Sequence, residues 1–307
     1  MKILFTGTSS FTGYWLIQKL IQQGHSVRAI CQKSRNLYDG IRKTRLNKLE
    51  ALCDIQYDCS FGSQPFIELI QSESSWDLFC HHAAETSDYK NCVFDYASAL
   101  ERNTHHLLAV LKLLQTRGCN RILLTGSVFE PGEGGSSDCR AVSPYGLSKG
   151  LTWQVFKYFA EICEMKLGKF VIPNPFGPYE DFRFTSYLIR SWIDGKIPMV
   201  NTPAYIRDNI HVDLLARNYC IWAESMGTNP GIEFCRPSGY VETQGEFTRR
   251  LAREMSERLS IDCPIELQAQ TDFPEPLIRF NTDRPRLMEW SEEMAWDALA
   301  HFYRRIA

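Results

Sequence analysis

The stretch Lys2-Ile3-Leu4-Phe5-Thr6-Gly7-Thr8-Ser9-Ser10-Phe11-Thr12-Gly13 decides the fold. Its apolar start predicts a buried strand, and the residues from Tyr14 to Gln23, closed by Gly24, predict a helix. Gly7 permits a tight turn between them, and Gly13 lets the helix lie close to the strand. The N–H groups at the start of such a helix can bind a pyrophosphate. Ser10 stands where a middle glycine is usual in this loop pattern.

Short apolar runs and helical stretches continue to alternate beyond this loop. We expect strands at 26–30, 53–57, 78–81 and 121–125, and a helix at 103–115 closed by Gly118. Apolar strands separated by helices are typical of a parallel sheet that is covered on both faces. The predicted fold class is therefore α/β, a Rossmann-like doubly wound parallel sheet with a smaller C-terminal substrate-binding lobe.

The regular pattern changes after about residue 170. Pro173, Pro175 and Pro178 interrupt it, and the later helical stretches are separated by proline- and glycine-containing segments. We expect a dinucleotide-binding domain over residues 1–172, with a returning segment at about 205–225, and a mainly substrate-binding lobe over residues 173–307.

Composition excludes several classes of protein. The chain has 307 residues with 34 Lys and Arg against 36 Asp and Glu, so no basic excess is available to bind nucleic acid. Its eleven cysteines are scattered without zinc-site spacing, so we expect free thiols, a cytoplasmic location and no metal. The pair His81-His82 does not chelate easily, because adjacent strand residues face opposite sides. No apolar run is long enough for a membrane span.

The residues after the second strand favour NADP over NAD. An acidic residue about twenty positions beyond the glycine loop would hold the ribose 2′-hydroxyl of NAD. No carboxylate lies between Gly7 and Asp39, whereas Lys33 and Arg35 could hold a 2′-phosphate. NADP is the predicted cofactor and NAD the alternative. The competing interpretation is that both cations lie on a solvated loop.

A tyrosine and a lysine form the candidate catalytic pair. Tyr145 and Lys149 are four residues apart in a predicted helix, so they share one face. An adjacent ammonium group stabilises phenolate and lowers the pKa of the tyrosine, which can then exchange a proton with a sugar hydroxyl or carbonyl. A hydroxyl at the end of the preceding strand would bind the reacting oxygen, with Thr125 as the first choice and Ser127 as the alternate.

With these residues the chain resembles the extended short-chain dehydrogenase/reductase family, in the branch that acts on nucleotide-activated sugars. Three further segments are similar to motifs of that family, and the likeness extends over nearly the whole chain. They are His81-His82-Ala83-Ala84, Asn174-Pro175-Phe176-Gly177-Pro178 and Arg207-Asp208-Asn209-Ile210-His211-Val212-Asp213.

The resemblance, together with the loop and the two cations, implies a set of binding residues. The expected cofactor contacts are Gly7, Ser9, Ser10, Phe11, Thr12, Gly13, Lys33, Arg35, Asp58, Cys59, His81, Ala83, Ala84, Asn103, Lys149 and Pro173. The expected substrate contacts are Glu85, Thr86, Thr125, Ser127, Asn174 and Arg207, of which the last would bind a diphosphate. The helix after Lys149 often forms a dimer interface in this family, so a homodimer is also implied.

Departures from the family motifs leave two reactions open. Its 4,6-dehydratases carry Asp-Glu directly after the catalytic threonine, where this chain has Gly126 and Ser127, and Glu85 cannot replace both groups. Reduction of a 4-keto sugar nucleotide by NADPH is the first hypothesis, because the cations favour NADP. A 4-epimerase with tightly bound NAD is the alternative. A non-catalytic NADP(H)-binding module is the hypothesis from a different class.

Overall fold

A seven-stranded parallel sheet forms the larger lobe of the computed structural model, which describes residues 1–86, 89, 91–135 and 140–305. The strand order is β10-β6-β5-β4-β1-β2-β3, so the predicted fold class is confirmed. The order reverses between β1 and β4, where α/β sheets bind ligands at their carboxyl ends. The strands are β1 (Lys2–Thr6), β2 (Ser26–Ile30), β3 (Asp54–Gln56), β4 (Leu78–His81), β5 (Arg121–Ser127), β6 (Lys166–Ile172) and β10 (Gly231–Cys235).

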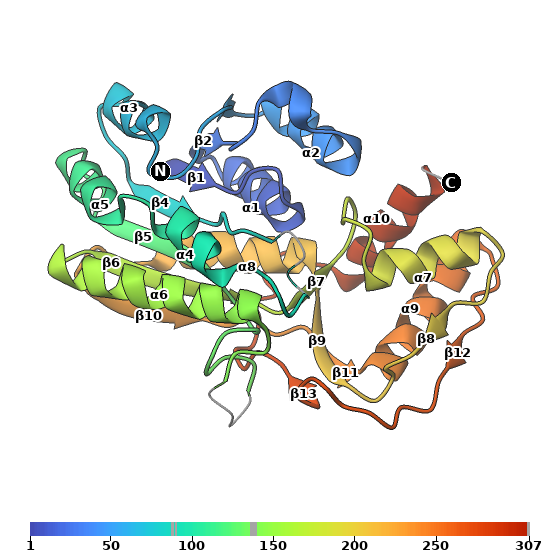
Figure 1. Ribbon diagram of the computed structural model, residues 1–307. Coiled ribbons are helices and arrows are strands. Elements are labelled where there is room, and N and C mark those ends of the chain that lie inside the picture. Colours follow the sequence, from blue (N-terminus) through green and yellow to red (C-terminus); the bar gives the residue numbers. More distant parts are fainter. Residues whose placement is uncertain (87–88, 90, 136–139, 306–307) are drawn as a thin grey trace.

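Helices cover both faces of this sheet, and each interface has an apolar core (Figure 1). One face packs against α1 (Phe11–Gln22), α2 (Gly40–Glu50) and α8 (Val212–Ser225). The other packs against α3 (Gln64–Ser72), α5 (Leu107–Thr116) and α6 (Pro144–Ile162), and α4 (Tyr96–Thr104) lies against α6. The central strands are buried on both sides, which explains why they read as continuous apolar runs.

The smaller lobe is built around a second, mixed sheet and three helices, at the right of Figure 1. Its apolar core gathers Phe176, Trp192, Phe247 and Trp296. The sheet strands are β7 (Asn174–Phe176), β9 (Ile206–His211), β11 (Tyr240–Thr243) and β13 (Ile278–Arg279), and β8 (Met199–Val200) pairs with β12 (Glu266–Leu267). The helices are α7 (Phe184–Ile193), α9 (Gln244–Leu259) and α10 (Glu292–Arg304).

Two predicted elements differ from the structure. The helix expected at 103–115 is divided between α4 and α5, because His106 adopts a left-handed conformation with φ of 54°. The segment that returns to the large sheet comprises α8 and β10, residues 212–235, rather than 205–225. Strand β9 stays in the smaller lobe because it pairs there with β7, β11 and β13.

One buried arginine joins the two lobes beside the glycine loop. The side chain of Arg45 on α2 is fully buried, and its Nε donates to the carbonyl of Ser9 at 3.1 Å. Its Nη1 donates to the carbonyl of Tyr179 at 2.8 Å, and its Nη2 lies 3.1 Å from Asp181 Oδ1. A single guanidinium therefore holds the loop and the smaller lobe in a defined relation.

Replacing Arg45 with Met should lower the free energy of unfolding by about 3 kcal/mol, because it leaves Asp181 and two carbonyls without their buried partner. Urea unfolding at pH 7 measures the change. The control is Arg249→Met, whose exposed pair with Glu246 should contribute less than about 0.5 kcal/mol. Equal losses in both variants would contradict the role given to Arg45.

Candidate active site

A cavity of about 1170 Å³ opens at the carboxyl ends of β1, β4 and β5 and is lined by both lobes. Pockets for one small molecule commonly measure roughly 300–1,000 Å³, so this cavity has room for a dinucleotide and a second ligand. The position is the point where the strand order reverses. Most of the residues expected from the sequence line it.

The glycine loop forms the upper wall of the cavity and keeps its backbone exposed there. Gly7 has φ of 86°, and a Cβ atom at this position would lie 2.8 Å from Ala83 N. Ser10 replaces the middle glycine by capping α1: its Oγ accepts from Gly13 N at 3.0 Å and donates to Gly7 O at 2.9 Å. Gly13 itself lies behind the loop, where a Cβ would be 2.2 Å from Gly7 O. The cradle thus fits a pyrophosphate at a helix N-terminus.

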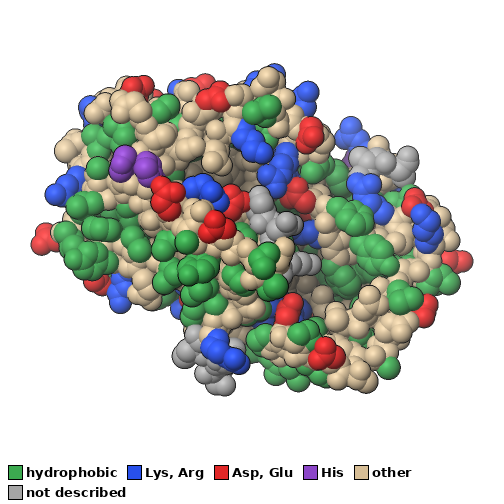
Figure 2. Space-filling view, in the orientation of Figure 1, with side chains coloured by type: hydrophobic (Ala, Val, Ile, Leu, Met, Phe, Trp, Pro, Cys, Tyr) green, Lys and Arg blue, Asp and Glu red, His purple; other side chains and the backbone are tan. Residues whose placement is uncertain are grey.

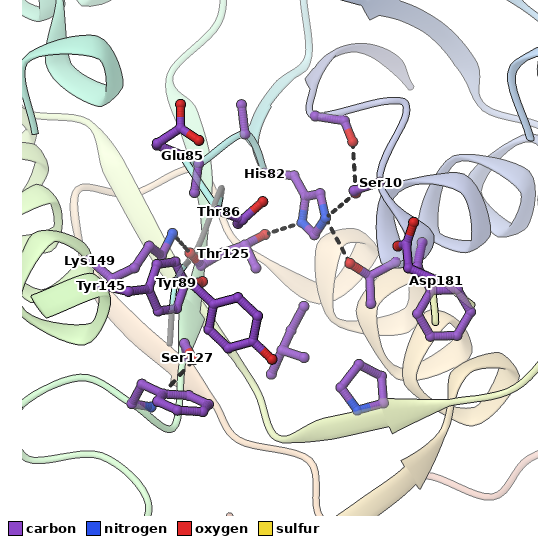
Figure 3. A pocket seen from close by; sticks show the side chains of 18 of the residues that line it. Ser10, His82, Glu85, Thr86, Tyr89, Thr125, Ser127, Tyr145, Lys149 and Asp181 are labelled. Carbon is purple, nitrogen blue, oxygen red and sulfur yellow. Dashed lines mark hydrogen bonds between the residues drawn. The ribbon is translucent and has the colours of Figure 1, made fainter. Parts of the chain in front are cut away.

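Lys149 and Tyr145 face the cavity from the first turns of α6 (Figure 3). Lys149 Nζ donates to the carbonyl of Thr125 at 2.5 Å. Burial lowers the pKa of Lys149 to about 8, the carboxylate of Glu130 opposes this shift, and the ammonium of Lys169 adds to it. The ammonium group of Lys149 is therefore oriented by its hydrogen bond to Thr125, and its pKa is lower than that of a solvated lysine.

The pKa of Tyr145 does not follow the sequence-based expectation. Burial raises the pKa of its phenol above the usual value, and the carboxylate of Glu130 raises it further. Arg183 and a hydrogen bond with Ser127 lower it, but they do not outweigh burial. The predicted lowering by Lys149 is wrong for this structure, because burial has the largest effect on the pKa of Tyr145.

Of the two candidate hydroxyls, the alternate lies against the tyrosine. Ser127 forms the hydrogen bond with Tyr145, and its backbone N donates to Glu130 Oε1 at 2.7 Å. Thr125 Oγ1 instead bonds His82 Nδ1 at 2.9 Å (Figure 3). The structure therefore brings Ser127 to the phenol and turns Thr125 toward the glycine loop.

His82 is a cavity residue that sequence reasoning missed. Its Nε2 lies 2.9 Å from Thr12 Oγ1 and 3.2 Å from Ser10 Oγ, so the ring links the loop to Thr125. Burial lowers its pKa to about 3, so the imidazole is neutral. His81 faces the other side of β4, where its ring stacks on Phe156 with centroids 5.1 Å apart. The signal in the sequence was a polar residue directly at the end of a central strand.

The cations expected to recognise a 2′-phosphate separate in the structure. Lys33 lines the cavity, but Arg35 turns away and forms a bidentate pair with Glu50 at 2.6 and 2.7 Å. Arg42 on α2 lines the cavity instead, 3.8 Å from Asp181. The prediction that Arg35 faces the cofactor is therefore corrected, since Glu50 on α2 satisfies its guanidinium.

Most of the other predicted contacts do line the cavity. They are Cys59, His81, Ala83, Ala84, Glu85, Thr86, Asn103, Pro173, Asn174 and Arg207. Asp58 does not, because it accepts a hydrogen bond from the Ser34 hydroxyl. Asn103 lies at the wall and donates to Thr152 Oγ1 at 3.2 Å.

Arg207 lies at the end of the cavity that the smaller lobe forms, and it is already paired. Its Nη2 lies 3.1 Å from Glu275 Oε2, and its guanidinium stacks on Tyr205 at 4.1 Å from the ring centroid. Arg279 lies 2.9 Å from the same carboxylate oxygen. Neither Glu275 nor Arg279 was expected from the sequence, which carries no motif for them.

Two observations outside the cavity concern metal binding and membrane-spanning helices. His25, Cys220 and Glu224 form the group of potential metal ligands found among the described residues. Burial raises the pKa of the Cys220 thiol to about 12, which disfavours the thiolate that binds metal. Within the described ranges, we find no helix whose length and hydrophobicity would allow it to cross a membrane.

Comparisons with known proteins agree with this architecture. The model of the NAD dependent epimerase/dehydratase family matches residues 3–232, which confirms the resemblance noted from the motifs. UDP-glucose 4-epimerase from Thermotoga maritima is 20% identical, with a TM-score of 0.76 over 100% of this chain and 99% of its own. UDP-glucuronic acid 4-epimerase from Bacillus cereus, solved with UDP-glucuronic acid and NAD, is 16% identical, with a TM-score of 0.77 over 100% of both chains.

A dehydratase has the same fold. DesIV, a dTDP-glucose 4,6-dehydratase from Streptomyces venezuelae, is 18% identical, with a TM-score of 0.74 over 99% of this chain and 97% of its own. At these identities the structural likeness establishes the fold alone. A comparison with curated protein sequences finds no match.

The pKa of Lys149 predicts a pH dependence of stability. Its pKa falls from 10.5 to about 8 on folding, so between these values the unfolded chain binds more protons and stability rises with pH. Lys149→Met removes this contribution, so wild type should gain about 3 kcal/mol relative to the variant from pH 8 to 10.5. Denaturant unfolding of both proteins across that range measures the difference. A difference that does not vary with pH would refute the shifted lysine.

Proposed function

The chain belongs to the NAD dependent epimerase/dehydratase family, and we propose that this member reduces the 4-keto group of a nucleotide-activated sugar with NADPH. The observation that carries the proposal is the placement of Tyr145, Ser127 and Lys149 in one cavity with the glycine loop. An acid, a hydroxyl donor and a dinucleotide cradle together suit hydride transfer to a carbonyl.

The residues present fit a nicotinamide dinucleotide. The loop from Gly7 to Thr12 would hold the pyrophosphate, because its backbone meets the cavity at the start of α1. Lys33 and Arg42 would hold a 2′-phosphate at the other end. When bound, the cofactor supplies the hydride.

The side chains then divide the proton chemistry among them. Tyr145 donates its proton to the carbonyl oxygen of the sugar as the carbon accepts hydride, and Ser127 donates a hydrogen bond to the same oxygen. Lys149, held on the Thr125 carbonyl, would contact the ribose of a bound cofactor and would supply positive charge to the site as the phenol gives up its proton.

The alternative is a nucleotide-sugar 4-epimerase that keeps NAD bound. It is favoured by the names of the similar structures, which include UDP-glucose and UDP-glucuronic acid 4-epimerases. An epimerase oxidises the sugar carbon and then returns the hydride to its other face, so it consumes no cofactor overall. Net consumption of NADPH distinguishes the reductase, and cofactor binding without any turnover would favour the non-catalytic module.

A homodimer through α4 and α6 is part of the proposal. The outward face of α6 exposes the apolar side chains of Leu147, Tyr158 and Ile162, whereas Trp153 and Phe156 are buried in the core of their own chain. Figure 2 shows hydrophobic side chains gathered on this face of the molecule. Exposed apolar side chains on one helix face suit association with a second copy. The mass in solution, measured by light scattering, tests this point.

The cysteines support a reducing compartment, and we place the protein in the cytoplasm. Ten cysteines are free thiols in the described residues, and Cys139 lies outside them. Burial raises the pKa of Cys31 and Cys80 to about 12, so both behave as small apolar groups rather than as reactive thiols.

Tyr145→Phe should abolish hydride exchange and leave cofactor affinity unchanged, since only the acid is removed. A panel of 4-keto sugar nucleotides with NADPH, followed by absorbance, measures turnover, and quenching of protein fluorescence measures cofactor binding. The matched control is Tyr158→Phe on the outer face of the same helix. Full activity of Tyr145→Phe would overturn the assignment.

The double variant Lys33→Ala with Arg42→Ala should bind NADPH about tenfold or more weakly and NADH almost unchanged, because only the 2′-phosphate loses charge-assisted hydrogen bonds. Fluorescence titration with both cofactors gives the ratio. Arg35→Ala serves as the control, because that guanidinium is paired with Glu50. An equal loss for NADH and NADPH would argue against NADP selectivity.

A further inference from the structure

The substrate end of the cavity contains two buried arginines that share one carboxylate. Arg207 on β9 and Arg279 on β13 are 4% and 5% exposed. Their guanidinium groups lie 3.1 and 2.9 Å from the same oxygen, Oε2 of Glu275. Among the described residues, two cations therefore share one anion, and buried charges are costly unless they are paired.

Other contacts with the protein hold the two guanidinium groups in place, independently of Glu275. Arg207 Nη1 donates to the carbonyls of Ile206 at 2.9 Å and Pro276 at 3.0 Å, and its plane stacks on Tyr205. Arg279 lies over the ring of Phe129 at 4.1 Å from the centroid. Its Nε is buried and has no hydrogen-bond partner among the described residues, so one donor is left over for a ligand.

Glu275, in contrast, is the exposed member of the group. It is 45% exposed and lies in the segment 268–277, which connects β12 to β13 without a helix or strand. The three charged side chains line the same cavity as Tyr145. The carboxylate therefore occupies the place on the two guanidinium groups that an anionic group of a ligand would take.

We propose that Glu275 is an internal counter-ion that the diphosphate of the substrate displaces, so that segment 268–277 opens as the ligand binds. This inference rests on the proposed function, because it takes a nucleotide-activated sugar as the ligand. A diphosphate diester carries two negative charges and neutralises both arginines, whereas Glu275 neutralises one. The exchange selects ligands with a diphosphate over sugars or nucleosides without one.

The test compares wild type with Glu275→Gln, each saturated with NADPH so that the glycine loop is occupied. Calorimetric titration with UDP and with inorganic pyrophosphate should give affinities about tenfold higher in the variant, because the ligand no longer displaces a carboxylate. Arg279→Met added to Glu275→Gln should remove the gain. Glu254→Gln, which affects pairs with Arg253 and Arg258 away from the cavity, should leave both affinities unchanged.

Thermal unfolding gives an independent readout. Without anion, Glu275→Gln should unfold at a lower temperature than wild type, since two buried guanidinium groups lose their partner, and saturating pyrophosphate should remove this difference. If that variant does not fold, Glu275→Asp keeps the charge with a shorter reach and should show a smaller gain in affinity. The proposal would be overturned if folded Glu275→Gln or Glu275→Asp bound UDP and pyrophosphate no more tightly than wild type does.

The outcomes separate this inference from the proposed reaction. If wild type turns over a sugar nucleotide but Glu275→Gln shows no gain in affinity, the proposed displacement of Glu275 is wrong and the proposed reaction is supported. If Glu275→Gln gains affinity for pyrophosphate but wild type turns over no sugar nucleotide, the displacement of Glu275 is supported and the proposed reaction is wrong.

Discussion

The close approach of the glycine loop to the end of β4 is the constraint on which the site depends. Gly7 lies so near the backbone of Ala83 that a side chain at Gly7 does not fit without movement. This contact places His82 within hydrogen-bond distance of Ser10 and Thr12 on one side and Thr125 on the other. Because Lys149 binds the carbonyl of Thr125, a continuous set of polar contacts extends from the loop to Lys149.

Burial controls the protonation of the groups along this path. The imidazole of His82 is neutral, the pKa of Lys149 falls to about 8 and the pKa of Tyr145 rises, each chiefly because the charged form is poorly solvated. Glu130 acts on both Tyr145 and Lys149, and its carboxylate is itself held by Lys169 at 2.6 Å. A buried ion pair outside the cavity thus modifies both pKa values, while burial remains the larger cause.

The two lobes contribute different chemistry, and ionic contacts relate them. The larger lobe contributes the glycine loop and Tyr145 to the cavity, while the smaller lobe contributes Arg207 and Arg279 with Glu275 between them. Arg45 ties the loop to the start of the smaller lobe through the carbonyls of Ser9 and Tyr179. A ligand that spans the cavity therefore meets the glycine loop and Lys149 at one end, and two buried arginines with an exposed counter-ion at the other.

The sequence alone determined the fold class, the glycine loop and the placement of Tyr145 and Lys149 on one helix beside the cavity, because each depends on local spacing along one strand or helix. It did not determine which hydroxyl meets the phenol, that Glu50 withdraws Arg35, or that Glu275 pairs with Arg207. These contacts join residues 15 to 68 positions apart in the chain, and only the packing of the elements brings them together. The direction of the pKa shift at Tyr145 was also out of reach, since burial depends on the whole fold rather than on the neighbouring lysine.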